Sequence, residues 1–276
     1  MEQKELTSKH TEEQDETTNA GYGGSLTETG RFETEAGFGF IEDAKLGHGA
    51  CACVTNTSAP IRVARLIASA QRDGVDAHGR VPPQLLAGQG ADAFIERNGL
   101  NKTKLVSGRA AKAHAKYARL ISSDDSGQIP AKRAKFDTVG AIGLTVGSVA
   151  CGSSSGGILL KRDGRIGSAA TWGAGFQCSE MAVATCTGTG EQIVTQGTAR
   201  LAISDAELGA VLEEDMAVGV LRGQIHQKSI VIEYGHTTPA MTVGAASTTS
   251  ARRDIRTSVK KSDSGGATVH AVKFAI

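Results

Sequence analysis

Aromatic residues are scarce in this sequence of 276 residues, and long apolar runs are absent. Phe, Trp and Tyr make up 4% of the chain, so the core must depend on Val, Ile, Leu and Ala. The formal net charge of +1 gives no overall field that would attract nucleic acid or an anionic membrane. No stretch is apolar enough to cross a bilayer, and the polar N-terminal segment 1–17 has no secretory signal. We therefore expect a soluble intracellular protein without nucleic-acid or membrane partners.

The five cysteines also lack a pattern typical of metal or disulfide sites, because no CxxC pair occurs. Cys51 and Cys53 would point to the same side of a strand, and no His-rich segment lies near them. No GxGxxG or GxxxxGK motif follows an expected strand. We expect buried reduced thiols, no metal and no cofactor.

The first half of the chain alternates glycine-rich loops with helical patterns. Residues 19–39 are punctuated by glycines, which predicts a tight loop that leads into short strands. Ser58 and Pro60 begin a helix with apolar positions at helical spacing, and Gly74 ends it. Residues 101–136 are more basic than the segments before them. They predict a helix with a basic face, followed by a flexible basic linker. The basic face consists of Lys112, Lys116 and Arg119.

The second half reads mainly as strands. The segments TVGAIGL and SVACGS predict a hairpin with its turn near Val146 and Gly147. One helix is expected after Gly188 and another from Ser204, where SDAE resembles a capping box. The segments SIVIEYG, AMTVGAA and the C-terminal ATVHAVKFAI predict further strands. This order favours a layered α/β sandwich.

The segment KFDTVGAIG, residues 135–143, contains the main chemical signal. A Thr hydroxyl needs a base, and the residue's own α-amine can serve as one if the preceding bond is cut. Thr138 at the start of a buried strand fits this role, with Asp137 on the other side of the cleaved bond. The structural alternative is that Asp and Thr only mark the beginning of a strand.

Three downstream segments supply what such a nucleophile needs. Ser154 and Ser155 end the second strand of the hairpin, where their hydroxyls would lie beside the Thr138 amine. Arg165 can hold a carboxylate through two hydrogen bonds. Thr187 and Gly188 precede an expected helix, so a hydroxyl and a backbone N–H could form an oxyanion hole.

The segments DTVGAIG, SSSGGILLKRDGRIGSA and CTGTGEQIV together resemble the catalytic half of the type-2 asparaginase family of N-terminal-nucleophile hydrolases. TNAGYGGSLTETGRFE and LLAGQGADAF are similar to two glycine turns of the same family. The resemblance covers roughly residues 18–276. It implies a four-layer αββα sandwich with mainly antiparallel sheets and self-cleavage before Thr138.

The resemblance also implies how the chain is divided. Residues 18–137 would form the α-subunit part, which ends in the linker of about residues 101–136, and residues 138–276 would form the β-subunit part. The two would remain together as an α/β heterodimer, which could pair again. Ser154, Ser168 and Gly190 join Arg165 as expected substrate-binding positions.

Position 168 distinguishes branches of the family. Asparaginases and isoaspartyl peptidases typically bind a free ammonium with an Asp three residues after the Arg, and here that residue is Ser168. A buried ammonium without a partner costs roughly 1–3 kcal/mol or more. HGRVPPQLLAGQGA and GHTTPAMTVGAAS also look like the threonine aspartase (taspase) branch, whose members cleave proteins after Asp. We expect that endopeptidase activity, with L-asparaginase or isoaspartyl peptidase activity as the alternative.

Two departures from the family pattern favour a third alternative, an uncleaved inactive paralogue. The family begins with a strand and a helix that have no counterpart here, so the sequence reads as truncated. The segment ETEAG at residues 33–37 replaces the family's usual Asp-Ala-Ser.

Two further features, His236 and a short basic run, are not part of the expected catalytic site. His236 is expected to be structural, because the Thr138 amine already provides a base. The run PAKRAKF is similar to a nuclear-import signal, which predicts binding of an import receptor through Lys132, Arg133 and Lys135. The expected location is therefore cytoplasmic, nuclear or both.

Overall fold

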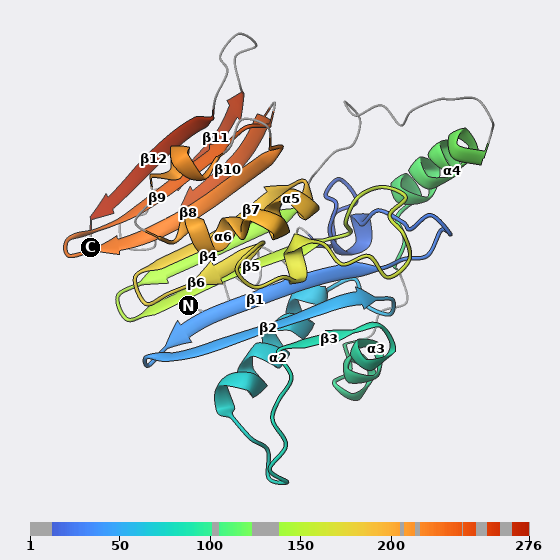
Figure 1. The fold of residues 1–276 in the computed structure, drawn as a ribbon, viewed down its shortest axis with the longest axis horizontal. Coiled ribbons are helices and arrows are strands. Elements are labelled where there is room, and N and C mark those ends of the chain that lie inside the picture. The colour runs from blue at the N-terminus through green and yellow to red at the C-terminus, as the bar shows by residue number, and fades with distance from the viewer. Residues whose placement is uncertain are drawn as a thin grey trace.

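The computed structural model describes residues 13–100, 105–122, 138–204, 207–212, 216–238, 240–246, 253–259 and 267–275. In this part of the chain, two five-stranded sheets lie face to face with helices on both outer sides (Figure 1). A separate pair of antiparallel strands, β10 (Ala240–Ala246) and β11 (Arg253–Val259), extends from the second sheet. The mixed α/β sandwich predicted from the sequence is confirmed.

The first sheet has the strand order β3-β2-β1-β5-β4 and is antiparallel except for the short β2–β3 pair. Its strands are β1 (Thr34–Glu42), β2 (Lys45–Val54), β3 (Leu85–Ala87), β4 (Val139–Thr145) and β5 (Ser148–Ser155). The hairpin predicted around Val146 and Gly147 is the β4–β5 pair. This pairing places the first residues of β4 beside the last residues of β5.

The second sheet has the order β12-β9-β8-β7-β6 and is antiparallel throughout. Its strands are β6 (Phe176–Cys178), β7 (Ala182–Gly188), β8 (Val218–His226), β9 (Ser229–His236) and β12 (Thr268–Ala275). Strands β4 and β5 of the first sheet pack against β7 and β8 of the second. One face of the β4–β5 hairpin therefore forms part of the buried interface between the two sheets.

Five of the described α-helices form the two outer layers. Helices α2 and α3 cover the first sheet, while α5, α6 and α7 lie against the second. Their bounds are α2 (Pro60–Asp73), α3 (Gly88–Arg97), α4 (Gly108–Ser122), α5 (Gly190–Gln196), α6 (Thr198–Ala202) and α7 (Leu208–Val211), with 3-10 turns η1 (Gly21–Gly23) and η3 (Ser168–Ala170). None of the described helices has the length and hydropathy that a membrane crossing requires.

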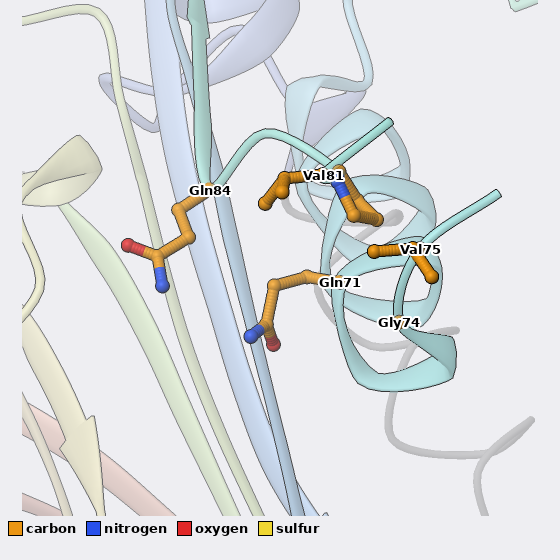
Figure 2. A pocket seen from close by; sticks show the side chains of 6 residues that line it. Gln71, Gly74, Val75, Val81 and Gln84 are labelled. Carbon is orange, nitrogen blue, oxygen red and sulfur yellow. The ribbon is translucent and has the colours of Figure 1, made fainter. Parts of the chain in front are cut away.

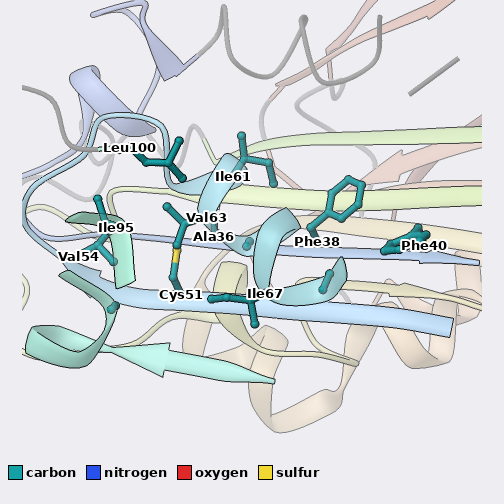
Figure 3. Packing of buried hydrophobic residues seen from close by; sticks show 13 residues of the cluster. Ala36, Phe38, Phe40, Cys51, Val54, Ile61, Val63, Ile67, Ile95 and Leu100 are labelled. Atoms are coloured by element: carbon teal, nitrogen blue, oxygen red, sulfur yellow. The ribbon is translucent and has the colours of Figure 1, made fainter. Parts of the chain in front are cut away.

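Helix α2 carries the apolar core of the first layer (Figure 3). Its buried side chains include Ile61, Val63 and Ile67, and each such burial contributes about 1.5–3 kcal/mol. The helix lies directly on β2, because a Cβ added at Gly49 would overlap the helix backbone at Ala68. Larger residues at position 49 would push the helix off the sheet.

Helix α4 confirms the helix predicted within residues 101–136, and it projects from the sandwich in Figure 1. Ala110 and Tyr117 are buried on one side, while Lys112, Lys116 and Arg119 are exposed on the other. The basic run that contains Lys132, Arg133 and Lys135 lies outside the described residues.

Two local predictions were wrong. No helix begins at Ser204, because its hydroxyl donates to the Leu201 carbonyl at the end of α6 and the next helix begins at Leu208. The two neighbouring thiols also face opposite sides. Cys51 joins the core under α2, whereas Cys53 packs toward the second sheet. A register shift in β1–β2 and the positive φ of 51° at Cys53 show that a bulge reverses the alternation.

Candidate active site

Thr138 immediately precedes β4 and is half-buried beside the end of β5. Its Oγ1 donates a hydrogen bond to Oγ of Ser155 at 3.0 Å. The Ser155 hydroxyl also accepts the N–H of Gly157 at 3.0 Å. The structure thus brings together the predicted nucleophile and one of the predicted serines. Asp137 lies outside the described residues.

Ser154 faces the other side of β5, as strand alternation requires. Its hydroxyl donates to Oε1 of the buried Glu13 at 2.5 Å, and the same oxygen accepts the N–H of Ile61 at 3.1 Å. Glu13 therefore ties β5 to the first turn of α2. In this arrangement the Ser154 hydroxyl serves this internal contact, on the face of β5 away from Thr138.

Asn19 holds the glycine turn that follows Ser155, and sequence reasoning gave it no role. Its Nδ2 donates to the Gly157 carbonyl at 2.6 Å, and its own carbonyl accepts the Gly156 N–H at 2.7 Å. Its Oδ1 accepts the Ser25 N–H at 2.8 Å. The Asn-Ala-Gly loop was visible in the sequence, but these partners are far away along the chain.

Thr187 and Gly188 lie in the second sheet at the same end as Thr138. A Cβ at Gly140 of β4 would lie 2.7 Å from the Thr185 side chain, and one at Gly223 would lie 2.5 Å from Leu144. Because Gly223 pairs with Val183, β4 and β7 run in opposite directions across the interface. From the Gly140–Thr185 contact, two residues back from Gly140 lead to Thr138, and two residues forward along β7 lead to Thr187. Because the strands run in opposite directions, Thr138 and Thr187 lie at the same end of the interface.

Gly188 has a conformation that demands glycine. Its φ is +133°, and an added Cβ would overlap the Ala217 carbonyl. The next N–H, that of Thr189, donates to the same carbonyl at 2.8 Å. The backbone at the predicted oxyanion position is thus fixed before α5 begins.

Arg165 is the last member of the group of predicted residues near Thr138. This group, the Thr138 ring, consists of Thr138, Ser155, Arg165, Thr187, Gly188 and Gly190. Its guanidinium lies on the backbone of three glycines, because added Cβ atoms would lie 2.7–3.0 Å from its Nη atoms at Gly157, Gly167 and Gly190. Its Nε donates to Oε1 of Glu191 at 2.8 Å, and Nη2 lies 2.7 Å from the same oxygen. Nη2 is buried and makes this ion contact without a hydrogen bond in the described part of the chain.

Two buried glutamates and a buried lysine support the loop that carries Arg165. Oε2 of Glu35 accepts the Gly167 N–H at 2.6 Å, and Oε2 of Glu33 accepts the Gly164 N–H at 2.8 Å. Nζ of Lys161 donates to the Glu33 carbonyl at 2.6 Å. The segment ETEAG, noted above only as a departure from the family pattern, thus anchors the loop.

Burial perturbs two of these groups in opposite ways. It raises the pKa of the Glu35 carboxyl above its ordinary value, against the effects of Lys161, the Gly167 N–H and Arg165. It lowers the pKa of Lys161, against the attraction of Glu35 and Glu33. Acidic and basic groups alternate from Lys161 through Glu35 and Arg165 to Glu191.

The other predicted positions are placed as follows. Ser168 is buried at the start of η3, and its N–H lies 3.4 Å from where a Gly190 Cβ would be. His236 is fully buried in β9, where Nδ1 lies 2.7 Å from the Thr238 carbonyl. Gly190 contacts Arg165, whereas His236 belongs to the structural frame of the second sheet.

An open hollow of about 500 Å³ lies elsewhere, between the end of α2 and the approach to β3 (Figure 2). It is lined by Gln71, Gly74, Val75, Val81, Pro82 and Gln84. None of these side chains is ionisable, and none belongs to the ring around Thr138. Over the described residues, no group of His, Cys, Asp and Glu is arranged to hold a metal ion.

Comparison with known proteins agrees with this geometry. The profile of the type-2 asparaginase family, described as asparaginase, matches residues 6–232. The isoaspartyl peptidase/L-asparaginase of Mus musculus is 33% identical over 208 residues, which are 73% of this chain and 59% of that protein. The human protein of the same name is 31% identical over 221 residues, 77% of this chain and 66% of its own.

A bacterial relative extends the match. The isoaspartyl peptidase of Salmonella typhimurium is 29% identical over 239 residues, 78% of this chain and 72% of that protein. The chain spans 57–59% of the length of the mouse and rat relatives. On the strength of the family match and the two-sheet sandwich, the chain belongs to the type-2 asparaginase family of N-terminal-nucleophile hydrolases.

Proposed function

We propose that this chain is a threonine-type hydrolase that cuts itself before Thr138. The observation that carries the proposal is the Thr138–Ser155 hydrogen bond, and the contact of Arg165 with Gly157, two residues after Ser155, supports it. In the first step, Thr138 Oγ attacks the Asp137 carbonyl, and the peptide bond is exchanged for an ester with release of the Thr138 amine. Water then hydrolyses the ester. The products have 137 and 139 residues, since 276 − 137 = 139.

The freed amine then acts in substrate turnover. It takes the proton of the Thr138 hydroxyl, which attacks the substrate carbonyl and forms an acyl-enzyme. The Thr187 hydroxyl and the Gly188 N–H stabilise the oxyanion, and Arg165 holds a carboxylate of the substrate. The proton returns to the leaving amine, and water releases the acid. Before the attack, Ser155 orients the Thr138 hydroxyl by accepting its hydrogen bond.

Isoaspartyl peptides and L-asparagine are the first candidate substrates. The names of the relatives favour them: isoaspartyl peptidase and L-asparaginase in the mammalian proteins, isoaspartyl peptidase in the bacterial one. In these substrates the scissile amide is formed by the side chain of an aspartyl unit, whose α-carboxylate would lie on Arg165. The relatives support this candidate over the threonine aspartase activity expected from the sequence.

Cleavage of proteins after Asp is the second candidate, and Ser168 favours it. A neutral hydroxyl at this position does not pair with a free ammonium, and a peptide substrate has none there. In this case Arg165 would hold the side-chain carboxylate of the Asp before the cleaved bond.

The assembly and location are proposals as well. We propose that the two cleaved parts stay together as an α/β heterodimer, since β1 of the first part pairs with β5 of the second along its whole length in the first sheet. Two heterodimers could pair again. Import into the nucleus through the basic run 130–136 would add to a cytoplasmic location.

A substrate panel separates the two candidates. We expect the purified chain to hydrolyse L-asparagine and an isoaspartyl dipeptide at least about tenfold more efficiently in kcat/KM than an internal Asp peptide, and the reverse ratio would support the endopeptidase. Arg165→Ala is the matched control, because it should lower kcat/KM by about 30- to 1000-fold for every carboxylate substrate. If no substrate is cut by the wild type, the chain is a catalytically silent relative and the proposal fails.

A further inference from the structure

Met241 of β10 lies beside Thr187, one of the two residues at the predicted oxyanion position. Thr187 in β7 and Gly219 in β8 are direct cross-strand partners. A Cβ added at Gly219 would lie 3.0 Å from Cγ2 of Thr187 and 3.2 Å from Sδ of Met241. The Thr187 methyl group and the Met241 thioether therefore flank the same point of the backbone. The glycine at position 219 leaves room for both.

This point lies at the Thr138 end of the interface between the sheets. Gly223 of β8 lies against Leu144 near the end of β4. Strand β7 runs opposite to β4 and pairs antiparallel with β8, so β4 and β8 run in the same direction. Going back along both strands from this contact leads to Thr138 in the first sheet and to Gly219 in the second. Met241 is thus placed at the opening of the interface where the nucleophile lies.

Arg165 approaches the same place from the other side of β7. The Cys186 N–H donates to the Gly175 carbonyl at 2.8 Å, on the side of β7 that pairs with β6. A Cβ at Gly175 would overlap the carbonyl of Ser168, which is three residues after Arg165. The loop that carries Arg165 therefore lies on the β6 side of β7, whereas Met241 lies over β8.

The two sides offer different chemistry to a substrate. In the proposed function, Arg165 holds a carboxylate of the acyl part. Met241 is half-buried and provides an apolar surface whose flexible thioether chain adapts to different shapes. The acyl part and the leaving amine extend in different directions from the carbonyl carbon that Thr138 attacks. With the acyl part on the β6 side, the leaving residue is directed toward β8 and Met241.

We propose that Met241 is a specificity-determining residue that contacts the side chain of the leaving residue and favours apolar ones. In an isoaspartyl peptide this is the residue linked to the aspartyl side chain, and in a protein cut after Asp it is the residue that follows the Asp. The inference rests on the proposed function, in either of its forms. Because the thioether chain is adaptable, the selectivity is for apolar character and not for one residue type.

Steady-state kinetics with isoaspartyl-leucine and isoaspartyl-glycine measure this contact on the purified chain. The wild type should prefer the leucine peptide by about 10-fold in kcat/KM, the effect of an apolar side chain that is partly removed from water. Met241→Ala and Met241→Gln should both reduce this ratio to about twofold. Met241→Leu should keep it, because the exchange conserves apolar volume. If the chain cuts only after Asp, peptides with Leu or Gly after the Asp replace the two probes.

Met181→Ala is the matched control. Met181 is an exposed methionine just before the opposite end of β7, so its loss should leave the ratio of the two rates unchanged. A control variant that lowers the ratio as much as Met241→Ala would overturn the proposal.

Three further results would overturn it. Equal loss of kcat/KM for both peptides in the Met241 variants would make Met241 only an anchor of β10. An unchanged ratio in both Met241→Ala and Met241→Gln would place the leaving residue elsewhere. A wild type that cuts both peptides equally well would remove the apolar subsite.

Failure of the proposed function gives a different result, because the wild type then cuts neither peptide. Calorimetric binding of the same two peptides to the full chain tests Met241 in that case. The wild type should bind the leucine peptide about 10-fold more tightly than the glycine peptide, and Met241→Ala about twofold more tightly. Equal affinity of the wild type for the two peptides would overturn the inference.

Discussion

The two faces of strand β1 differ in what they contribute. On one face, Ala36, Phe38 and Phe40 pack under α2 in an entirely apolar layer. On the other face, Glu35 supports the Arg165 loop. The next two residues on that face are Gly37 and Gly39, which leave room for the rings of Phe176 and Trp172. One strand thus separates a region that supplies stability from a region that positions chemistry. Substitutions on the two faces should therefore have different consequences.

The largest effect on stability is expected on the α2 face. Ile67→Ala removes a fully buried side chain of α2 and should lower the free energy of unfolding by about 2–5 kcal/mol. Substrate turnover per folded molecule at low temperature should stay within about twofold, because no contact of the Thr138 ring is lost. Urea unfolding and active-site titration measure the two quantities. A large loss of turnover in the folded fraction would show that the faces are coupled.

A smaller, pH-dependent effect is expected on the other face. Burial raises the folded-state pKa of Glu35, so its contribution to stability is present at low pH and is lost as the pH rises from its unfolded value through its folded value. Glu35→Gln removes this dependence while keeping an acceptor for the Gly167 N–H. Between the two pKa values, the wild type should lose about 1.4 kcal/mol per pH unit relative to the variant.

Urea titrations between pH 4 and pH 8 would measure that difference. Glu28→Gln, an exposed acid in the preceding loop, serves as the control and should run parallel to the wild type. If the Glu35→Gln curve also runs parallel to the wild-type curve, the pKa of Glu35 is not raised, and the attraction of Lys161 and Arg165 fully offsets the effect of burial.

Local patterns predicted much of this architecture. The helix from Pro60, the hairpin turn at Gly147 and the helix after Gly188 each carry their own signals in neighbouring residues. The ring of Thr138, Ser155 and Arg165 followed from motifs in the right order. These features depend on short-range backbone preferences or on chemistry that requires particular residue types.

Contacts between distant segments were not predictable in the same way. Asn19 reaches Gly157, Glu13 reaches Ser154, and Glu35 reaches Gly167, each across more than a hundred residues. The bulge at Cys53 reverses a face by inserting a residue, which no alternation of residue types reveals. Glu191 looked like an ordinary first-turn acid of a helix until its contact with Arg165 was seen.

Self-cleavage at Thr138 is the central claim, and intact-mass measurement on the purified chain tests it most directly. The wild type should resolve with time into pieces of 137 and 139 residues, and the longer piece should begin with Thr138. Thr138→Ala should remain one chain, and Thr138→Ser should cleave at the same bond more slowly, because it keeps the hydroxyl but loses the packing of the methyl group. A wild-type chain that stays whole after long incubation, or a Thr138→Ala chain that is cut at this bond, would contradict the account.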